Sequence, residues 1–218
     1  FIMTSSVNVY ENDHVSVTSV CDDSTINIIL AVDGVVTPAA SSSCASADGA
    51  YSISGISFSP NDTLTLFIDG EADEGATVSI DPISSIGNMD IYEDHVIVRH
   101  EGTDPILIAD LADYDTDDDS DIPFNTVGTT SVTIDPNVKL LVWDNKEFEP
   151  LGDITTGGGG GGALDGTVEL QDDATLTLAD SETHSFGGNL ESGTGATFNP
   201  AQSTVTFTSD GSGRTIDT

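Results

Sequence analysis

The chain has 218 residues, with 38 Asp and Glu against 4 Lys and Arg, and its formal net charge is −34. Such a surface has almost no side chains that could replace the counterions of phosphates, which argues against nucleic acid and against anionic lipid as partners. We find no run of about 18 apolar residues, so no membrane insertion is expected. Because self-repulsion on this scale opposes folding unless salt or cations screen it, we expect an extracellular or cell-surface protein in a saline or calcium-containing medium.

The first part of the chain predicts short alternating strands separated by turns. Asp33-Gly34 and Asp69-Gly70 are hairpin signals, and no helical periodicity accompanies them. This pattern is typical of an immunoglobulin-like β-sandwich, which we place at residues 1–85. Residues 39–47 are expected in a loop. The expected strands are 7–9, 15–17, 26–30, 51–53, 64–68 and 78–80.

Two local features of this first part allow specific predictions. Cys21 and Cys44 are the only cysteines, and an even pair in a secreted-looking β domain predicts a disulfide. The alternative is two free thiols. Asn61-Asp62-Thr63 is an N-x-[ST] sequon in a predicted turn, so Asn61 is a candidate glycosylation site.

The second part, residues 86–218, contains internal echoes. Residues 174–178 resemble 196–200, and 181–183 resemble 203–205, both at an offset of 22 residues, with a weaker relative at 137–142. Stacked strand-and-turn coils produce such offsets, so we predict a β-solenoid or a flattened two-sheet relative of one. Chance similarity among Thr/Gly-rich strands is the alternative. A single strand is expected at 91–98.

Six consecutive glycines, Gly157 to Gly162, lie within this second part. The run has no side chain to pack and high backbone entropy, so it indicates a flexible surface loop between coils. It does not stand in the strand-GxxxxGK[ST]-helix context of a phosphate-binding loop, and no Lys follows it.

A dense acidic run is the candidate cation site. Its alternating carboxylates suit a hard cation such as Ca²⁺, which takes several oxygen ligands from one loop. An EF-hand is excluded, because its sixth and twelfth positions, counted from Asp113, are Asp118 and Phe124. No cofactor is required, and a diffusely neutralised loop is the alternative. The candidate ligands are Asp110, Asp113, Asp115, Asp117, Asp119 and Asp121.

Several phrases of the chain look like modules of a known class. They are GAYSISG at 49–55, NDTLTLFIDG at 61–70, IYEDHVIVRH at 91–100, and the ATF and STVTFT phrases near the C-terminus. Together they resemble large secreted bacterial and archaeal surface proteins, adhesin-like repeat proteins in which immunoglobulin-like and β-solenoid modules alternate. The resemblance implies an extracellular structural or adhesive role and carries no catalytic residue.

Catalysis is not expected. The four histidines, His14, His95, His100 and His184, lie far apart in the sequence, and none stands in an HExxH or GxSxG context. Carboxylates are so numerous that a glycosidase-like pair has no specificity. A polysaccharide-degrading enzyme therefore rests on fold-level analogy with parallel β-helices alone. For a carbohydrate-binding module, Trp143 is the lone platform candidate, and it could equally cap the core.

These observations predict a structural subunit of an extracellular filament or surface assembly, built as a homopolymer. The apolar triplet Phe1, Ile2 and Met3 could donate a strand to a neighbouring subunit, and head-to-tail contacts of that kind form open fibres. The alternative is an adhesin or carbohydrate-binding section of a longer surface protein, with glycans as ligands and both ends cut from that chain.

Overall fold

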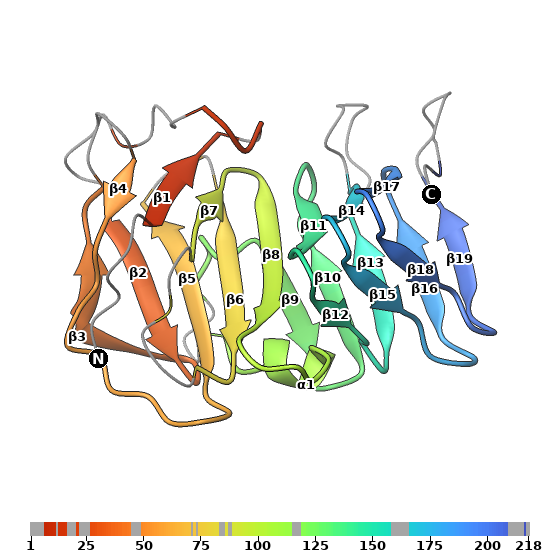
Figure 1. Ribbon diagram of the computed structural model, residues 1–218, viewed down its shortest axis with the longest axis horizontal. Helices are drawn as coiled ribbons and strands as arrows, with labels where there is room; N and C mark the ends of the chain where they lie inside the picture. The colour runs from red at the N-terminus through yellow and green to blue at the C-terminus, as the bar shows by residue number, and fades with distance from the viewer. Residues whose placement is uncertain are drawn as a thin grey trace. The chain divides into compact units, whose positions relative to one another are not determined.

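A computed structural model describes residues 7–11, 13–16, 21, 27–44, 49–70, 72, 74–82, 86, 89–114, 119–157, 166–208 and 216. Within these residues the protein is almost entirely β-structure, with one short α-helix (Figure 1). It divides into two compact units. Unit 1 comprises Phe1–His95 and Asp113–Pro123, and unit 2 comprises Val96–Ala112 and Phe124–Thr218. The chain first passes from unit 1 to unit 2 after His95, later than the predicted boundary at residue 85. The acidic segment Asp113–Pro123 belongs to unit 1.

The described residues of unit 1 form two groups of paired strands. Four strands form an antiparallel sheet in the order β6-β5-β2-β3, and three short strands form a second sheet in the order β4-β1-β7. In the second sheet β1 is antiparallel to β4 and parallel to β7. The strands are β1 (Val7–Tyr10), β2 (Asn27–Val32), β3 (Val35–Ser42), β4 (Ala50–Tyr51), β5 (Thr63–Asp69), β6 (Ala76–Ile80) and β7 (Ile91–Tyr92).

The two sheets share one hydrophobic core. Leu64 and Leu66 of β5 are fully buried in it, together with Val9 of β1 and Ile91 of β7. The turn between β2 and β3 is the predicted hairpin, since Asp33 and Gly34 have φ values of 46° and 68°, as a type I′ turn requires. The core of unit 1 is therefore closed by strands far apart in sequence.

Three local predictions in unit 1 are wrong. Val15 lies in a bend and is 78% exposed, because the Asp13 carboxylate accepts the backbone N–H groups of Val15 and Ser16. Residues 39–42, expected in a loop, continue β3, an edge strand that tolerates Pro38. The expected strand 91–98 is broken at Asp94, whose φ is 57°.

Unit 2 is organised by three parallel ladders. Their orders are β11-β14-β17, β12-β15-β18 and β10-β13-β16-β19, and β9 pairs antiparallel with β10. Strand β8 (His95–His100) begins with the last residue of the first segment of unit 1 and continues in unit 2. The other elements are α1 (Ile108–Leu111), β9 (Phe124–Val127), β10 (Ser131–Ile134), β11 (Lys139–Val142), β12 (Glu147–Phe148), β13 (Asp153–Thr156), β14 (Val168–Leu170), β15 (Thr175–Thr177), β16 (Thr183–Phe186), β17 (Leu190–Ser192), β18 (Thr197–Asn199) and β19 (Thr204–Phe207).

The predicted repeat offset is confirmed in two ladders and corrected in the third. Thr175 pairs with Thr197 and Val168 with Leu190, both at the predicted spacing. Thr183 pairs with Thr204, however, so the echo at 203–205 is out of register by a single position. The pairing follows the buried face of the strands and not the similarity of the two sequences, because the inward-facing His184 pairs with Val205. A slip by a single position would turn every side chain of β19 to the opposite face.

The glycine run lies between β13 and β14, as predicted for a loop between coils. Gly157 packs closely, since a Cβ atom there would lie 2.7 Å from the nitrogen of Pro136. The remaining glycines of the run lie outside the described residues. Leu140 pairs with Val168 across this connection, so the ladder offset is larger there than between Val168 and Leu190 in the next layer.

Aspartates connect successive layers of unit 2 at their turns. The Oδ1 atom of Asp172 accepts the N–H of Thr194 at 2.8 Å, and Oδ1 of Asp153 accepts the N–H of Thr183 at 2.8 Å. Asp180 does the same for Gln202 at 3.0 Å. Backbone donors at a turn need such acceptors, so part of the acidic composition has a structural use.

Candidate functional site

The last layer of unit 2 is the first candidate site. Among the described residues, β18 and β19 each pair with one strand only, and β17 is followed by an isolated bridge from Leu190 to Ile216. A strand edge of this kind presents backbone N–H and C=O groups to a further strand. Figure 1 shows these strands in blue, as the last members of their ladders.

Side-chain burial falls from one layer to the next at this end. Leu176 and Phe186 are fully buried, whereas their ladder partners Phe198 and Phe207 are half-buried. The same holds for the inward position of His184, which is fully buried, and its half-buried partner Val205. The apolar rows of the stack therefore continue to its last layer, where they are only partly covered.

His184 introduces an imidazole into one of these rows. Its Nδ1 accepts the N–H of Ile154 at 3.2 Å, so Nε2 carries the proton and has no hydrogen-bond partner among the described residues. Burial lowers the pKa of His184 and outweighs the opposing effect of the Asp153 carboxylate. The side chain is thus kept neutral inside unit 2.

Unit 1 contains an acidic cluster that includes two of the predicted cation ligands. Carboxylate oxygens of Asp69, Asp119 and Asp121 lie within 4.8 Å of one another. Partial burial, and then the charges of Asp119 and Asp121, raise the pKa of Asp69. Oδ2 of Asp121 also accepts the N–H of Gly70 at 2.7 Å. The sequence did not suggest Asp69, which becomes a neighbour of this run only through the fold.

The other predicted ligands are not gathered into this cluster. Burial and the charge of Asp33 raise the pKa of Asp113. Asp110 belongs to unit 2, where its Oδ2 accepts the N–H of Leu107 at 2.8 Å at the start of α1. Asp115 and Asp117 lie outside the described residues.

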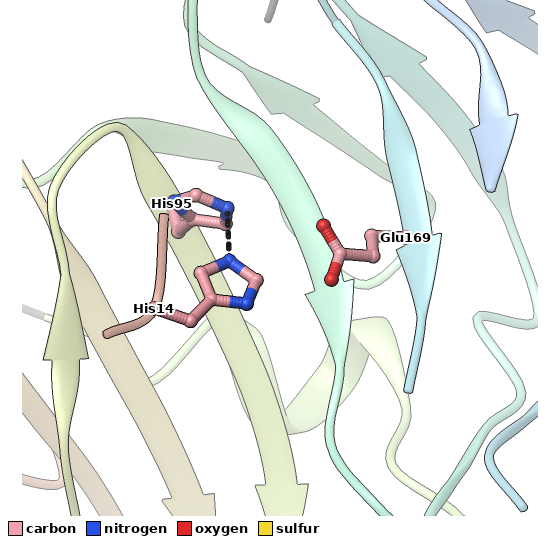
Figure 2. A group of neighbouring side chains, drawn as sticks. All are labelled: His14, His95 and Glu169. Carbon is pink, nitrogen blue, oxygen red and sulfur yellow. Dashed lines mark hydrogen bonds between the residues drawn. The ribbon is translucent and has the colours of Figure 1, made fainter. Parts of the chain in front are cut away.

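Two histidines of unit 1, not anticipated as a pair, form the second cluster. The Nε2 atoms of His14 and His95 are 3.0 Å apart (Figure 2). Nδ1 of His95 donates to the carbonyl oxygen of Glu93 at 2.6 Å, so its Nε2 carries the lone pair and accepts from Nε2 of His14. The third residue drawn in Figure 2, Glu169, belongs to unit 2.

The remaining predicted residues have plain outcomes. Cys21 and Cys44 form the predicted disulfide, with Cα atoms 5.3 Å apart. Asn61 lies in an exposed turn with φ of 68°. Phe1, Ile2 and Met3 lie outside the described residues.

Arg99 and Lys139 form ion pairs within unit 2. Arg99 forms an ion pair with Glu101 at 2.8 Å, and its guanidinium lies 5.4 Å from the ring centre of Trp143. Nζ of Lys139 lies 3.0 Å from Glu169 and 3.4 Å from Glu191. Because one face of the half-buried Trp143 is occupied by Arg99, that face is not an open sugar platform.

No protein-family model matches the chain, and neither curated proteins nor solved structures show a significant match to it. Within the described residues, no helix combines the length and the apolar character that a membrane-spanning segment needs.

Proposed function

We propose that the chain is a structural subunit of an extracellular filament or cell-surface assembly, in which the last layer of unit 2 receives a further layer of strands. The observation that carries this proposal is the half-burial of Phe198, Val205 and Phe207, whose partners one layer earlier are fully buried. Three parallel ladders support the interpretation of unit 2 as a β-solenoid, and a solenoid layer buries its apolar row only between two neighbours.

A second copy of the chain is the proposed source of that layer. Contacts that join one end of a subunit to a different surface of the next are heterologous, and they propagate into open fibres when the rotation does not close. Strand donation by Phe1, Ile2 and Met3 is the proposed mechanism of joining. Unit 1, whose two sheets share one hydrophobic core, is the proposed immunoglobulin-like part of each subunit.

The proposed extracellular location has two supports. The Cys21–Cys44 disulfide persists in oxidising compartments, and a net charge of −34 needs the screening of a saline medium. An adhesin or carbohydrate-binding section of a longer surface protein is the second candidate. In that case the further layer belongs to the same polypeptide.

Electron microscopy and sedimentation of the purified chain test the proposal with two matched variants. Val205→Asp places a charge on the inward row of β19, whereas Thr206→Asp places it on the exposed outward face of the same strand. We expect fibres from the unmodified chain and from Thr206→Asp, and single chains from Val205→Asp. Circular dichroism checks that both variants remain folded.

A third variant, lacking residues 1–6, tests the mechanism of joining. Loss of fibres supports strand donation, and unchanged fibres exclude it while leaving the last layer of unit 2 as the interface. If the unmodified chain never exceeds one copy in saline or calcium-containing buffer, the polymer proposal is overturned.

A further inference from the structure

We propose that His14 and His95 form a binding site in unit 1 for a divalent transition-metal ion of the Cu²⁺ or Ni²⁺ class. This site is separate from the acidic cluster, whose oxygen ligands suit hard cations such as Ca²⁺. Imidazole nitrogen suits borderline cations, and affinity for a given nitrogen site rises along the first-row series to Cu²⁺. The proposal does not depend on whether the chain polymerises.

The separation of the two ring nitrogens fits adjacent ligands of one ion. Metal–imidazole bonds are about 2.0–2.1 Å long, so two nitrogens at a right angle around one ion lie about 2.9 Å apart. The Nε2 atoms of His14 and His95 are 3.0 Å apart. A right angle is the geometry of the square-planar and tetragonal sites that Cu²⁺ and Ni²⁺ prefer.

His95 is already oriented as a metal ligand. Its Nδ1–H donates to the carbonyl oxygen of Glu93 at 2.6 Å, which leaves the lone pair on Nε2. Metal-bound histidines usually donate their second ring nitrogen in this way, because the hydrogen bond fixes both the tautomer and the ring. The side chain is fully buried at the start of β8, so its position is fixed by packing as well.

His14 is held by a tight turn and by an aromatic ring. The Asp13 carboxylate accepts hydrogen bonds from the Ser16 hydroxyl and from the N–H groups of Ser16 and Val15, and these bonds lower its pKa to about 2. The His14 ring stacks on Tyr92, with centroids 4.3 Å apart and planes 14° apart. A ligand fixed before binding loses less entropy when the ion arrives.

The topology of unit 1 explains why residues 81 positions apart meet. Strands β1 and β7 are parallel, with Tyr10 opposite Tyr92. The segments that follow these two strands therefore leave the small sheet at the same end. His14 follows the first strand and His95 the second. The site therefore depends on this pairing and has no local sequence signature.

Binding requires a change of tautomer at His14 and a rotation of the rings, because both Nε2 lone pairs must then point to the ion and not along the line between the two nitrogens. In the ion-free pair, Nε2 of His14 donates its hydrogen to Nε2 of His95. When the ion binds, that hydrogen moves to Nδ1 of His14 by exchange with water, and both Nε2 lone pairs bind the metal. Both imidazoles stay neutral, and water completes the coordination sphere.

Pulsed electron paramagnetic resonance on the complete chain with one equivalent of Cu²⁺ tests the site, because modulation from the remote ring nitrogens counts coordinated imidazoles. We expect two. Calorimetry with Cu²⁺ and Ni²⁺ should show one site that His14→Asn and His95→Asn each weaken by about tenfold or more. Excess Ca²⁺ should not displace the ion.

The matched control is His100→Asn, which removes a histidine from the opposite end of the same strand, β8. It should leave the nitrogen count at two and the affinity unchanged. A count of one or zero in the unmodified chain overturns the proposal, and this readout does not depend on the variants folding. Equal binding by the His14→Asn/His95→Asn double variant, with circular dichroism confirming its fold, also overturns it by assigning the ion to carboxylates.

Discussion

All four Lys and Arg residues of the chain belong to unit 2, and unit 1 contains none. In unit 2, Lys139 joins two glutamates of successive strands and Arg99 pairs with Glu101. Unit 1 has the disulfide instead, and it has no Lys or Arg of its own to balance its acidic cluster. The two units therefore differ in how they are held together: unit 1 has a disulfide and an acidic cluster, whereas unit 2 has parallel ladders that repeat from layer to layer.

Two intrinsic probes can follow the units separately. The only tryptophan, Trp143, lies in unit 2, and all four tyrosines lie in unit 1. Tryptophan fluorescence therefore reports the unfolding of unit 2, and tyrosine absorbance that of unit 1. The effect of a substitution can thus be assigned to one unit or to both.

The largest effect should come from the interior of the stack. Phe186→Ala removes a fully buried ring, so we expect unit 2 to lose about 3–5 kcal/mol of unfolding free energy. Phe207→Ala, in the half-buried partner one layer later, should cost less than about 2 kcal/mol. Denaturant titration of single chains, followed by tryptophan fluorescence, checks both. Equal losses would contradict the open last layer.

Removal of the crosslink should come next and should affect unit 1. Cys21→Ser with Cys44→Ser opens a loop with a sequence separation of 23, for which chain entropy predicts a loss of about 3 kcal/mol. The tyrosine-monitored transition should shift, and the tryptophan-monitored one should not. A shift of both by the same amount would show that the units unfold together.

The turn aspartates should contribute a smaller, local effect in unit 2. Asp172→Ala leaves the N–H of Thr194 without its acceptor, which should cost about 1 kcal/mol. Asp144→Ala is the matched control, because this exposed turn carboxylate makes no hydrogen bond with the described residues. A similar loss in the control would assign the effect to charge and not to the bond.

Acid should weaken unit 2 through His184. Its pKa lies below the ordinary value of 6.5 because the ring is buried, so the unfolded chain takes up a proton first as pH falls. The stability is fully present above pH 6.5 and is lost as pH decreases through the lower folded-state pKa. His184→Gln keeps an acceptor for Ile154 without titrating, so its tryptophan-monitored stability should fall less between pH 6.5 and 5. Identical pH profiles would contradict this assignment.

Calcium should give the smallest effect, confined to unit 1. The Asp69 pKa is raised by burial and by neighbouring carboxylates, so Ca²⁺ at the acidic cluster should stabilise unit 1 beyond sodium chloride of equal ionic strength, by mass action. Asp69→Asn should reduce that increment. Melting curves in chelator, calcium and matched salt decide between a specific site and diffuse screening.

The sequence predicted features that depend on neighbours in the chain. The Asp33-Gly34 hairpin was recognisable because its turn type demands those residues, and the repeat was visible because ladder partners such as Leu176 and Phe198 share a local phrase. The register of β19 could not be predicted, because the similarity of Ser and Thr residues does not show which face of a strand is buried. Val15 was misread because alternation alone does not show that Asp13 holds the backbone in a turn.

The candidate sites were harder to predict, because their members come from distant segments. Asp119 and Asp121 were identified, but Asp69 joins them only through the fold of unit 1. The pair of His14 and His95 depends on the parallel alignment of Tyr10 and Tyr92, and a single sequence contains no signal for it. Composition gives the net charge of the chain but does not show which carboxylates lie close together.

The connection between β13 and β14 has a consequence for how such a chain can change. Pairing resumes in register at Val168, although the offset from Leu140 to Val168 is larger than the offset from Val168 to Leu190 in the following layer. Gly187 donates its N–H to Oγ1 of Thr156 at 3.0 Å, and the same hydroxyl donates to the carbonyl of Gly166, so the base of the connection is fixed from both sides. We therefore expect residues inserted beyond that base to leave the pairing of β11 with β14 in register. New recognition sequences can therefore be added at this position, by evolution or by design, while the strands of the ladder keep their pairing.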